Sequence, residues 1–285
     1  MTTSVKRQPE AGSELERSFA CDAGTFRRAP FVAGALLEFG RELRELGESR
    51  LAPAGEADLL VRSNPFAFLV AVILDQGVPA ERAFTAPLVL EQRLGPLRPG
   101  WVLRHSAQLR RAMKRPPMPH RYPDRSATWI LAAARKVVEE LGGETDRLWA
   151  DAPTARALRQ RLEEFDGIGQ KKSAMAVEIL AQELGTPVAD LDGSDVAVDV
   201  HVRRVFTRTG LASSDAVQEI VEAARDAYPE RPGELDAPTW VIGRTWCRPR
   251  IPSCGDCPIA WACPSASSLA SKAPSLALPI PPMPI

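Results

Sequence analysis

The sequence predicts an all-α protein, and three observations support that fold class. Apolar residues recur at intervals of three and four in several long segments, which is the spacing of one face of a helix. No segment shows the two-residue alternation of a half-buried strand. A chain of 285 residues, 45% of them hydrophobic, can bury one large core or two moderate ones. We therefore expect helices arranged in one or two domains.

The elements follow from composition and periodicity along the chain. Residues 1–28 are polar and lack a sustained apolar period, and we interpret them as a flexible arm. Four prolines between residues 116 and 123 remove backbone donors and interrupt any helix, so a loop is expected there. Residues 265–285 are rich in proline, serine and alanine and predict a disordered tail. Helices are expected over residues 31–46, 65–74, 126–141, 154–165 and 171–184.

The sequence contains no predicted membrane segment. Its longest apolar run, Pro65 to Leu74, has ten residues, whereas a spanning helix needs roughly 18 or more. No apolar stretch with basic flanks opens the chain, so no export signal is expected. We therefore expect a soluble, cytoplasmic monomer, associated with the nucleoid if the source is bacterial.

The formal net charge is zero, but the charges are segregated. Between Gly100 and Lys136, nine basic residues are opposed only by Asp124, which gives this stretch a net charge of +8. Such a density favours an anion-binding face. The alternative is a solvated basic surface balanced by acidic neighbours such as Glu139 and Glu140.

Four of the five cysteines are clustered, with the spacing C-x6-C-x2-C-x5-C, and Cys21 stands alone. The cluster consists of Cys247, Cys254, Cys257 and Cys263. Disulfides are rare in a reducing cytosol, and structural zinc sites usually use two separated C-x2-C pairs rather than one. Prolines and a glycine between the cysteines allow the sharp turns that bring four thiolates to one [4Fe-4S] cluster. We predict that cluster, with zinc or four unliganded thiols as the alternatives.

A Gly167-Ile168-Gly169 turn separates two helical segments and is followed by Lys171 and Lys172. Glycines here permit a tight turn and let the N–H groups at the start of the second helix approach a phosphate, aided by the helix dipole. Taken alone, this turn could equally join two packed helices.

Further along, the segment Val198-Asp199-Val200-His201-Val202-Arg203-Arg204 precedes the cysteine cluster. The order of these three motifs resembles the endonuclease III and adenine-glycosylase branches of the helix-hairpin-helix DNA glycosylase family. The resemblance extends from about Asn64 to Cys263. It implies a two-domain fold, with a six-helix barrel domain that carries the hairpin at residues 63–190. Residues 29–62 and 191–264 would form an iron-sulfur cluster domain.

The same resemblance implies roles for individual residues. Lys171 matches the family's nucleophilic lysine, and Asp199 matches its essential aspartate. Gln76 matches the glutamine that fills the gap left by an everted base. Arg121 lies where a second DNA-contacting loop is expected, although a plain surface loop is equally consistent. The arginines near the cluster that would face DNA phosphates are Arg244, Arg248 and Arg250.

Chemistry supports the roles of the lysine and the aspartate. Cleavage of an N-glycosidic bond builds positive charge on the sugar, which a carboxylate such as Asp199 would stabilise. A lysine that attacks C1′ must first lose its proton, and at an ordinary pKa this costs roughly 4 to 5 kcal/mol at pH 7. The resulting Schiff base permits β-elimination, so Lys171 implies a lyase step. Alternatively, Lys171 contacts a phosphate or solvent and Asp199 is a helix N-cap, a role compatible with catalysis.

Two departures from the family pattern bear on these assignments. The interval from Lys171 to Asp199 is about ten residues longer than in endonuclease III. Next to Gln76, the family has small residues where this chain has Leu74 and Asp75, and a carboxylate is an unexpected neighbour for DNA.

The sequence therefore predicts a base-excision-repair DNA glycosylase and abasic-site lyase acting on damaged bases in duplex DNA, with oxidised pyrimidines as the first candidates. A monofunctional glycosylase for mismatched, alkylated or deaminated bases is the second hypothesis. A cluster-bearing protein that binds DNA without catalysis is the third.

Overall fold

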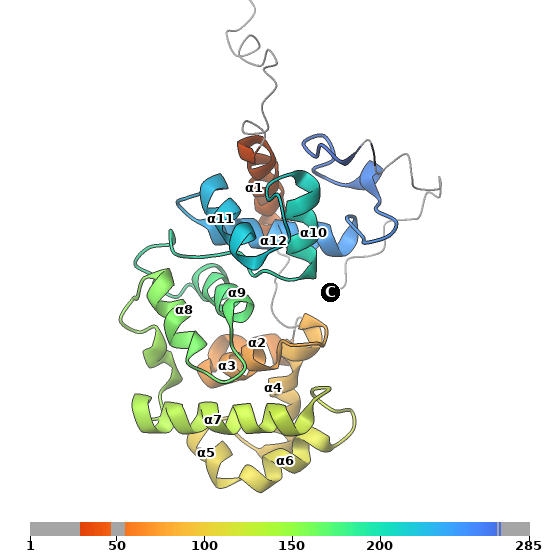
Figure 1. The fold of residues 1–285 in the computed structure, drawn as a ribbon. Helices are drawn as coiled ribbons and strands as arrows, with labels where there is room; N and C mark the ends of the chain where they lie inside the picture. Colours follow the sequence, from red (N-terminus) through yellow and green to blue (C-terminus); the bar gives the residue numbers. More distant parts are fainter. Residues whose placement is uncertain (1–28, 47–54, 267, 269–285) are drawn as a thin grey trace, which may run out of the picture.

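The computed structural model describes residues 29–46, 55–266 and 268, and within these ranges it contains α-helices and short 3₁₀ turns but no strand (Figure 1). The predicted arm at residues 1–28 and nearly all of the predicted tail lie outside the described residues. The α-helices are α1 Ala29–Glu45, α2 Glu56–Ser63, α3 Pro65–Leu74, α4 Ala80–Leu94, α5 Pro99–Arg104, α6 Ser106–Lys114, α7 Pro123–Leu141, α8 Ala155–Glu163, α9 Gln170–Gln182, α10 Val200–Thr209, α11 Val217–Ala227 and α12 Asp236–Thr245. The 3₁₀ turns are η2 Thr145–Leu148, η3 Pro232–Leu235 and η4 Cys254–Asp256.

The five helices expected from periodicity are all present, within a few residues of the expected bounds. The largest difference is at α7, which begins at Pro123 rather than at Ser126. Pro123 occupies the first helical position, where its missing N–H costs no hydrogen bond. The expected proline loop therefore ends at Tyr122.

The described helices pack into two lobes, each with its own hydrophobic core (Figure 1). The first core collects apolar side chains from α2 to α9, and the second collects them from α1, α10, α11, α12 and the cysteine loop. Helix α1 packs against α12, so a segment from the start of the described chain completes the second lobe. Helix α2, which lies within the expected 29–62 segment, packs instead in the first lobe through Ala57 and Val61.

Helix α3 forms the centre of the first lobe. Nine of its ten residues are buried, and Pro65 is the exception. The Oδ1 atom of Asn64 caps the helix by accepting hydrogen bonds from the N–H groups of Phe66 and Ala67 at 3.0 and 3.1 Å. This apolar run is therefore core. Within the described ranges no single helix is long and apolar enough to cross a membrane, although α2 and α3, which meet at a 111° bend, would suffice together by length and composition.

Candidate functional site

The C-terminal end of α3 and the N-terminal end of α9 meet at the junction of the two lobes. Lys171, in the first turn of α9, places its Nζ 2.7 Å from Oδ2 of Asp75, the C-cap residue of α3. Asp199 caps the start of α10, and Asp236 begins α12. Both of these carboxylates act electrostatically on Lys171. The structure thus brings together Lys171 and Asp199, the lysine and aspartate that the motifs singled out.

The long interval between α9 and α10 is accommodated without separating these residues. The chain first runs beside the start of α8, where the carbonyl oxygen of Asp190 accepts from the N–H of Ala155 at 3.2 Å. It then returns to α9, where Nε2 of Gln170 donates to the carbonyl oxygen of Val196 at 2.8 Å. Gln170 therefore fixes the chain three residues before Asp199, beside the first turn that carries Lys171.

The two glycines of the turn before α9 differ in how strongly the structure requires them. Gly167 has φ +84°, and a Cβ there would lie 2.8 Å from ring atoms of Trp129, so both conformation and space demand glycine. Gly169 is the N-cap of α9, and a Cβ there would meet nothing within 4 Å. The first N–H groups of α9 have no partner within the helix. The turn therefore presents backbone donors to an open approach.

Asp199 uses one carboxylate oxygen to cap α10. Its Oδ1 accepts from the N–H groups of His201 and Val202 at 2.7 and 2.9 Å. Among the described residues, no hydrogen bond reaches Oδ2. The cap thus fixes the carboxylate while leaving one oxygen available. His201 contacts Arg204 at 3.1 Å and packs edge-on against Trp240, which is a structural arrangement.

The two consecutive lysines have opposite electrostatic environments. Burial lowers the pKa of Lys171, but Asp75, Asp199 and Asp236 outweigh it, so the pKa lies above its ordinary value. Burial lowers the pKa of Lys172 to about 8, and the charge of Lys171 adds to this, against the attraction of Asp75. Nζ of Lys172 donates to the carbonyl oxygen of Ile73 at 2.6 Å, which satisfies a free carbonyl at the end of α3. Lys172 is therefore a buried structural residue.

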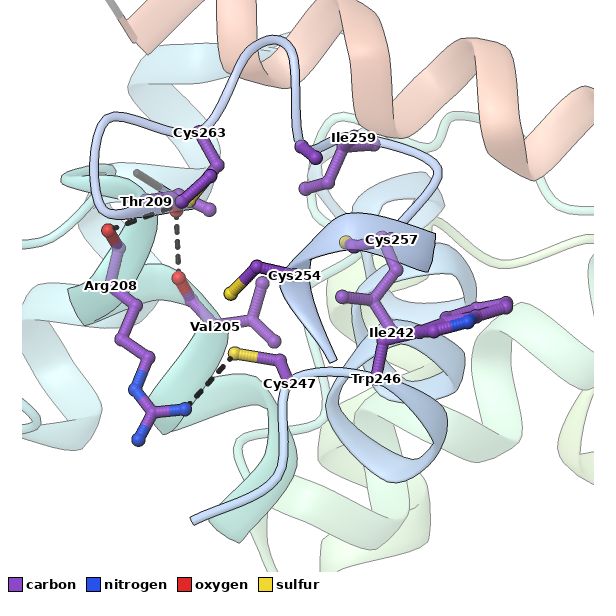
Figure 2. A pocket seen from close by; sticks show the side chains of 12 residues that line it. Val205, Arg208, Thr209, Ile242, Trp246, Cys247, Cys254, Cys257, Ile259 and Cys263 are labelled. Atoms are coloured by element: carbon purple, nitrogen blue, oxygen red, sulfur yellow. Dashed lines mark hydrogen bonds between the residues drawn. The ribbon is translucent and has the colours of Figure 1, made fainter. Parts of the chain in front are cut away.

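All four clustered cysteines line a single recess between α10, α12 and the C-terminal loop (Figure 2). The remaining lining is mostly apolar and includes Val205, Ile242, Trp246 and Ile259. Among the described residues, no three His, Cys, Asp or Glu side chains are grouped closely enough to hold a single metal ion. The four thiols thus share one recess.

Burial and mutual proximity act on the thiols. Burial raises the pKa of Cys257 to about 11, and the other three thiols add to the effect. Burial also raises the pKa of Cys254 and of Cys263. Arg208 of α10 supplies positive charge, with its Nη1 3.4 Å from Sγ of Cys247 (Figure 2). The same Nη1 lies 2.7 Å from the carbonyl oxygen of Arg248. Thiolates in this recess require a further positive centre.

Comparison with known proteins identifies relatives of the chain. It is 33% identical over 140 residues to the adenine DNA glycosylases of Mus musculus and Homo sapiens, which covers 47% of this chain and 24% and 22% of those proteins. It is 32% identical over 143 residues to endonuclease III of Synechocystis, which covers 49% of this chain and 55% of that protein. The chain thus spans about a quarter to a half of these relatives. No family model matches it.

The solved structures cover far more of the chain. A trapped covalent intermediate of endonuclease III with DNA superimposes with a TM-score of 0.62 at 19% identity, over 84% of this chain and 97% of that one. The chain therefore has the fold of endonuclease III. A thermostable thymine-DNA glycosylase gives a TM-score of 0.60 at 17% identity, over 86% and 99% of the two chains. The all-α helix-hairpin-helix fold expected from the motifs is thus confirmed.

In this endonuclease III-like fold, Gln76 and Arg121 lie on adjacent loops. Gln76 is exposed just after α3, and Arg121 places its guanidinium 4.8 Å from the ring centroid of Tyr122. The buried His120 joins the two loops, with Nε2 2.8 Å from the carbonyl oxygen of Gln76. Its Nδ1 accepts from the N–H of Tyr122 at 3.1 Å, so Nε2 carries the proton and donates to Gln76. His120 thus fixes the spacing of the two loops.

The basic residues predicted to face DNA differ in how free they are. Arg248 and Arg250 are exposed on the cysteine loop. Arg244 instead pairs with Glu81 at 2.7 Å and stacks 4.9 Å from the ring centroid of Trp240. The basic stretch between residues 100 and 136 is partly neutralised, because Lys114 pairs with Asp124 and Lys136 with Glu140 and Glu164.

Sequence reasoning gave no function to Asp75 and missed the linking role of His120. The signal for Asp75 was its position directly after a wholly apolar helix, since a carboxylate placed there is buried and requires a cation. The sequence offered no comparable signal for His120, because the carbonyl oxygen that it links to, that of Gln76, lies 44 residues away.

Proposed function

We propose that this protein is a DNA glycosylase with abasic-site lyase activity that removes a damaged base, such as an oxidised pyrimidine, from duplex DNA. The observation that carries the proposal is the meeting of Lys171 and Asp199 at the lobe junction, despite the long interval between them. A nucleophilic amine and a carboxylate are the two groups that a bifunctional glycosylase needs beside C1′.

Each residue has a distinct chemical task. The damaged nucleotide is everted from the stack toward the junction. As the C1′–N bond breaks and its electron pair leaves with the base, the free Oδ2 of Asp199 opposes the positive charge that develops on the sugar. The neutral amine of Lys171 forms the new bond to C1′, and the Schiff base that follows activates the sugar for loss of the 3′ phosphate.

The surrounding residues would hold the duplex. The N–H groups at the start of α9, made accessible by Gly167 and Gly169, suit a phosphate. Gln76 and Arg121, held at a fixed spacing, would enter the duplex around the everted base. Arg248 and Arg250 add exposed positive charge, and Arg244 would contribute on release from Glu81.

A [4Fe-4S] cluster fits the cysteine recess. Its four irons each take one thiolate, so the thiols must encircle a volume, whereas zinc draws four sulfurs to about 2.3 Å from one centre. The four cysteines line one recess, which otherwise has mostly apolar walls. When bound, the cluster would fix the loop that carries Arg248 and Arg250. Arg208 already bonds this loop to α10.

The test uses duplexes with one abasic site or one damaged base, with borohydride trapping and base release as separate readouts. We expect Lys171→Ala to abolish trapping while DNA affinity is retained, because phosphate binding rests on backbone N–H groups. We expect Asp199→Asn to abolish base release with little loss of stability, because an amide oxygen can still cap α10. Normal base release and trapping in both variants would refute the assignment.

A monofunctional glycosylase is a second candidate, and the Lys171–Asp75 pair favours it, because an ion-paired ammonium group is not nucleophilic. Base release by the wild-type protein without any trapping, at any pH, would select this alternative. If the protein binds these duplexes but neither releases a base nor is trapped, it binds DNA without catalysis.

A further inference from the structure

The two side chains of the Lys171–Asp75 ion pair differ strongly in their exposure to solvent. The Asp75 side chain is 5% exposed, whereas that of Lys171 is 37% exposed. A buried carboxylate without a cation is costly, so Asp75 favours a protonated partner. Within the described residues, Lys171 is the only side chain paired with it by a hydrogen bond.

The other charged groups around Lys171 also favour its ammonium form, with one exception. Asp199 from α10 and Asp236 from α12 both favour the ammonium form. Lys172, the neighbour on α9, disfavours a second positive charge, but its Nζ is directed to the carbonyl oxygen of Ile73. From α8, Glu163 faces α9 but bonds Oγ of Ser173.

We propose that Asp75 is a positioning residue that holds Lys171 as an ammonium ion and thereby suppresses the Schiff-base step at neutral pH. The inference rests on the proposed role of Lys171 as a nucleophile. Base removal assisted by Asp199 does not require the neutral amine, because water can add to C1′ as the base leaves and lose its proton to solvent, so the two steps are uncoupled. The protein then releases the base and leaves mainly intact abasic strands at neutral pH.

The proton balance explains why the pair controls the second step. For the Nζ lone pair to bond to C1′, one proton must leave the ammonium group to water or to Oδ2 of Asp75. Either route gives up the ion pair, and the lost attraction adds to the barrier. Asp75→Asn keeps the shape of the side chain and removes the charge, so more of Lys171 is neutral at a given pH.

The experiment measures borohydride trapping on preformed abasic DNA from pH 6 to 10, for the wild type, Asp75→Asn and Lys171→Ala. Asp151→Asn serves as a charge-matched control, since Asp151 pairs with Arg161 on the surface. We expect Asp75→Asn to trap at least about tenfold faster than the wild type at pH 7.5. The increase of its trapping rate with pH should occur at least about one pH unit lower than in the wild type. The control should follow the wild type. Equal or slower trapping by Asp75→Asn across the range would overturn the proposal.

A second readout keeps the inference separate from the proposed function. The chain has only six lysines, so ¹³C-methylated Lys171 can be assigned by the signal lost in Lys171→Ala and titrated in the DNA-free protein. We expect its pKa to lie above 10.5 in the wild type and to fall in Asp75→Asn. If the pKa of Lys171 behaves in this way but neither the wild type nor Asp75→Asn is trapped on DNA, Asp75 controls the charge of Lys171 and the nucleophilic role of Lys171 is wrong. If Asp75→Asn leaves the titration unchanged, the proposal fails whatever the activity.

Discussion

Lys172 offers a direct test of the electrostatics at the lobe junction. Its side chain is 5% exposed, and burial lowers the pKa of its ammonium group from the ordinary 10.5 to about 8. At about 1.4 kcal/mol per pH unit, this difference means that charged Lys172 destabilises the folded protein by about 3 kcal/mol at neutral pH. The pKa is lower in the folded than in the unfolded chain. The unfolded chain therefore binds more protons between pH 8 and 10.5, and stability rises with pH in that window.

The perturbation is Lys172→Met, which keeps most of the side-chain length and removes the titrating group. The assay is urea unfolding followed by tryptophan fluorescence, at intervals from pH 7 to 10, for the wild type and the variant. The free energy of unfolding of the wild type should gain about 2 to 3 kcal/mol relative to Lys172→Met across this range. The lost hydrogen bond to Ile73 adds an offset independent of pH, and titrating groups that do not interact with Lys172 cancel in the difference.

Lys114→Met is the matched control, because Lys114 is 56% exposed and its substitution should give parallel stability curves. Parallel curves for Lys172→Met as well would show that Lys172 titrates as a solvated lysine. Lys172 would then not be buried against the end of α3.

Three further outcomes are expected. The purified protein should be brown and contain about four irons per chain, and Cys257→Ser should lose most of the iron; stoichiometric zinc without iron after anaerobic purification would exclude the cluster. Affinity for duplex DNA should fall steeply with salt concentration. The slope of log affinity against log salt should be smaller by about one in Arg248→Ala or Arg250→Ala if that arginine contacts a phosphate. A flat response in the wild type would show that these arginines are only solvated. Gly167→Ala should destabilise the protein by about 1 to 3 kcal/mol in thermal unfolding, since it adds a Cβ 2.8 Å from Trp129 at φ +84°, and an unchanged Tm would show that the turn relaxes freely.

The sequence by itself determined the local structure and the identity of the motifs. The helical segments were predictable because apolar spacing and the proline at the first position of α7 act within a few residues. The clustering of the four cysteines was also a property of the chain, since their separations are covalently fixed. The N-cap role of Asp199 belongs to the same class, because its bonds reach only two and three residues ahead.

Only the tertiary structure determines the protonation of the side chains at the lobe junction. Asp75 and Lys171 lie 96 residues apart, and nothing in the spacing of either predicts that α3 ends where α9 begins. The sequence matched Lys171 to the family's nucleophile but showed no difference in burial between the two lysines, whereas packing buries Lys172 against the end of α3 and leaves Lys171 37% exposed. Local geometry is set by the repeat of the helix, whereas the protonation of a side chain depends on burial and on charges delivered by distant segments. The tertiary fold alone brings those segments together.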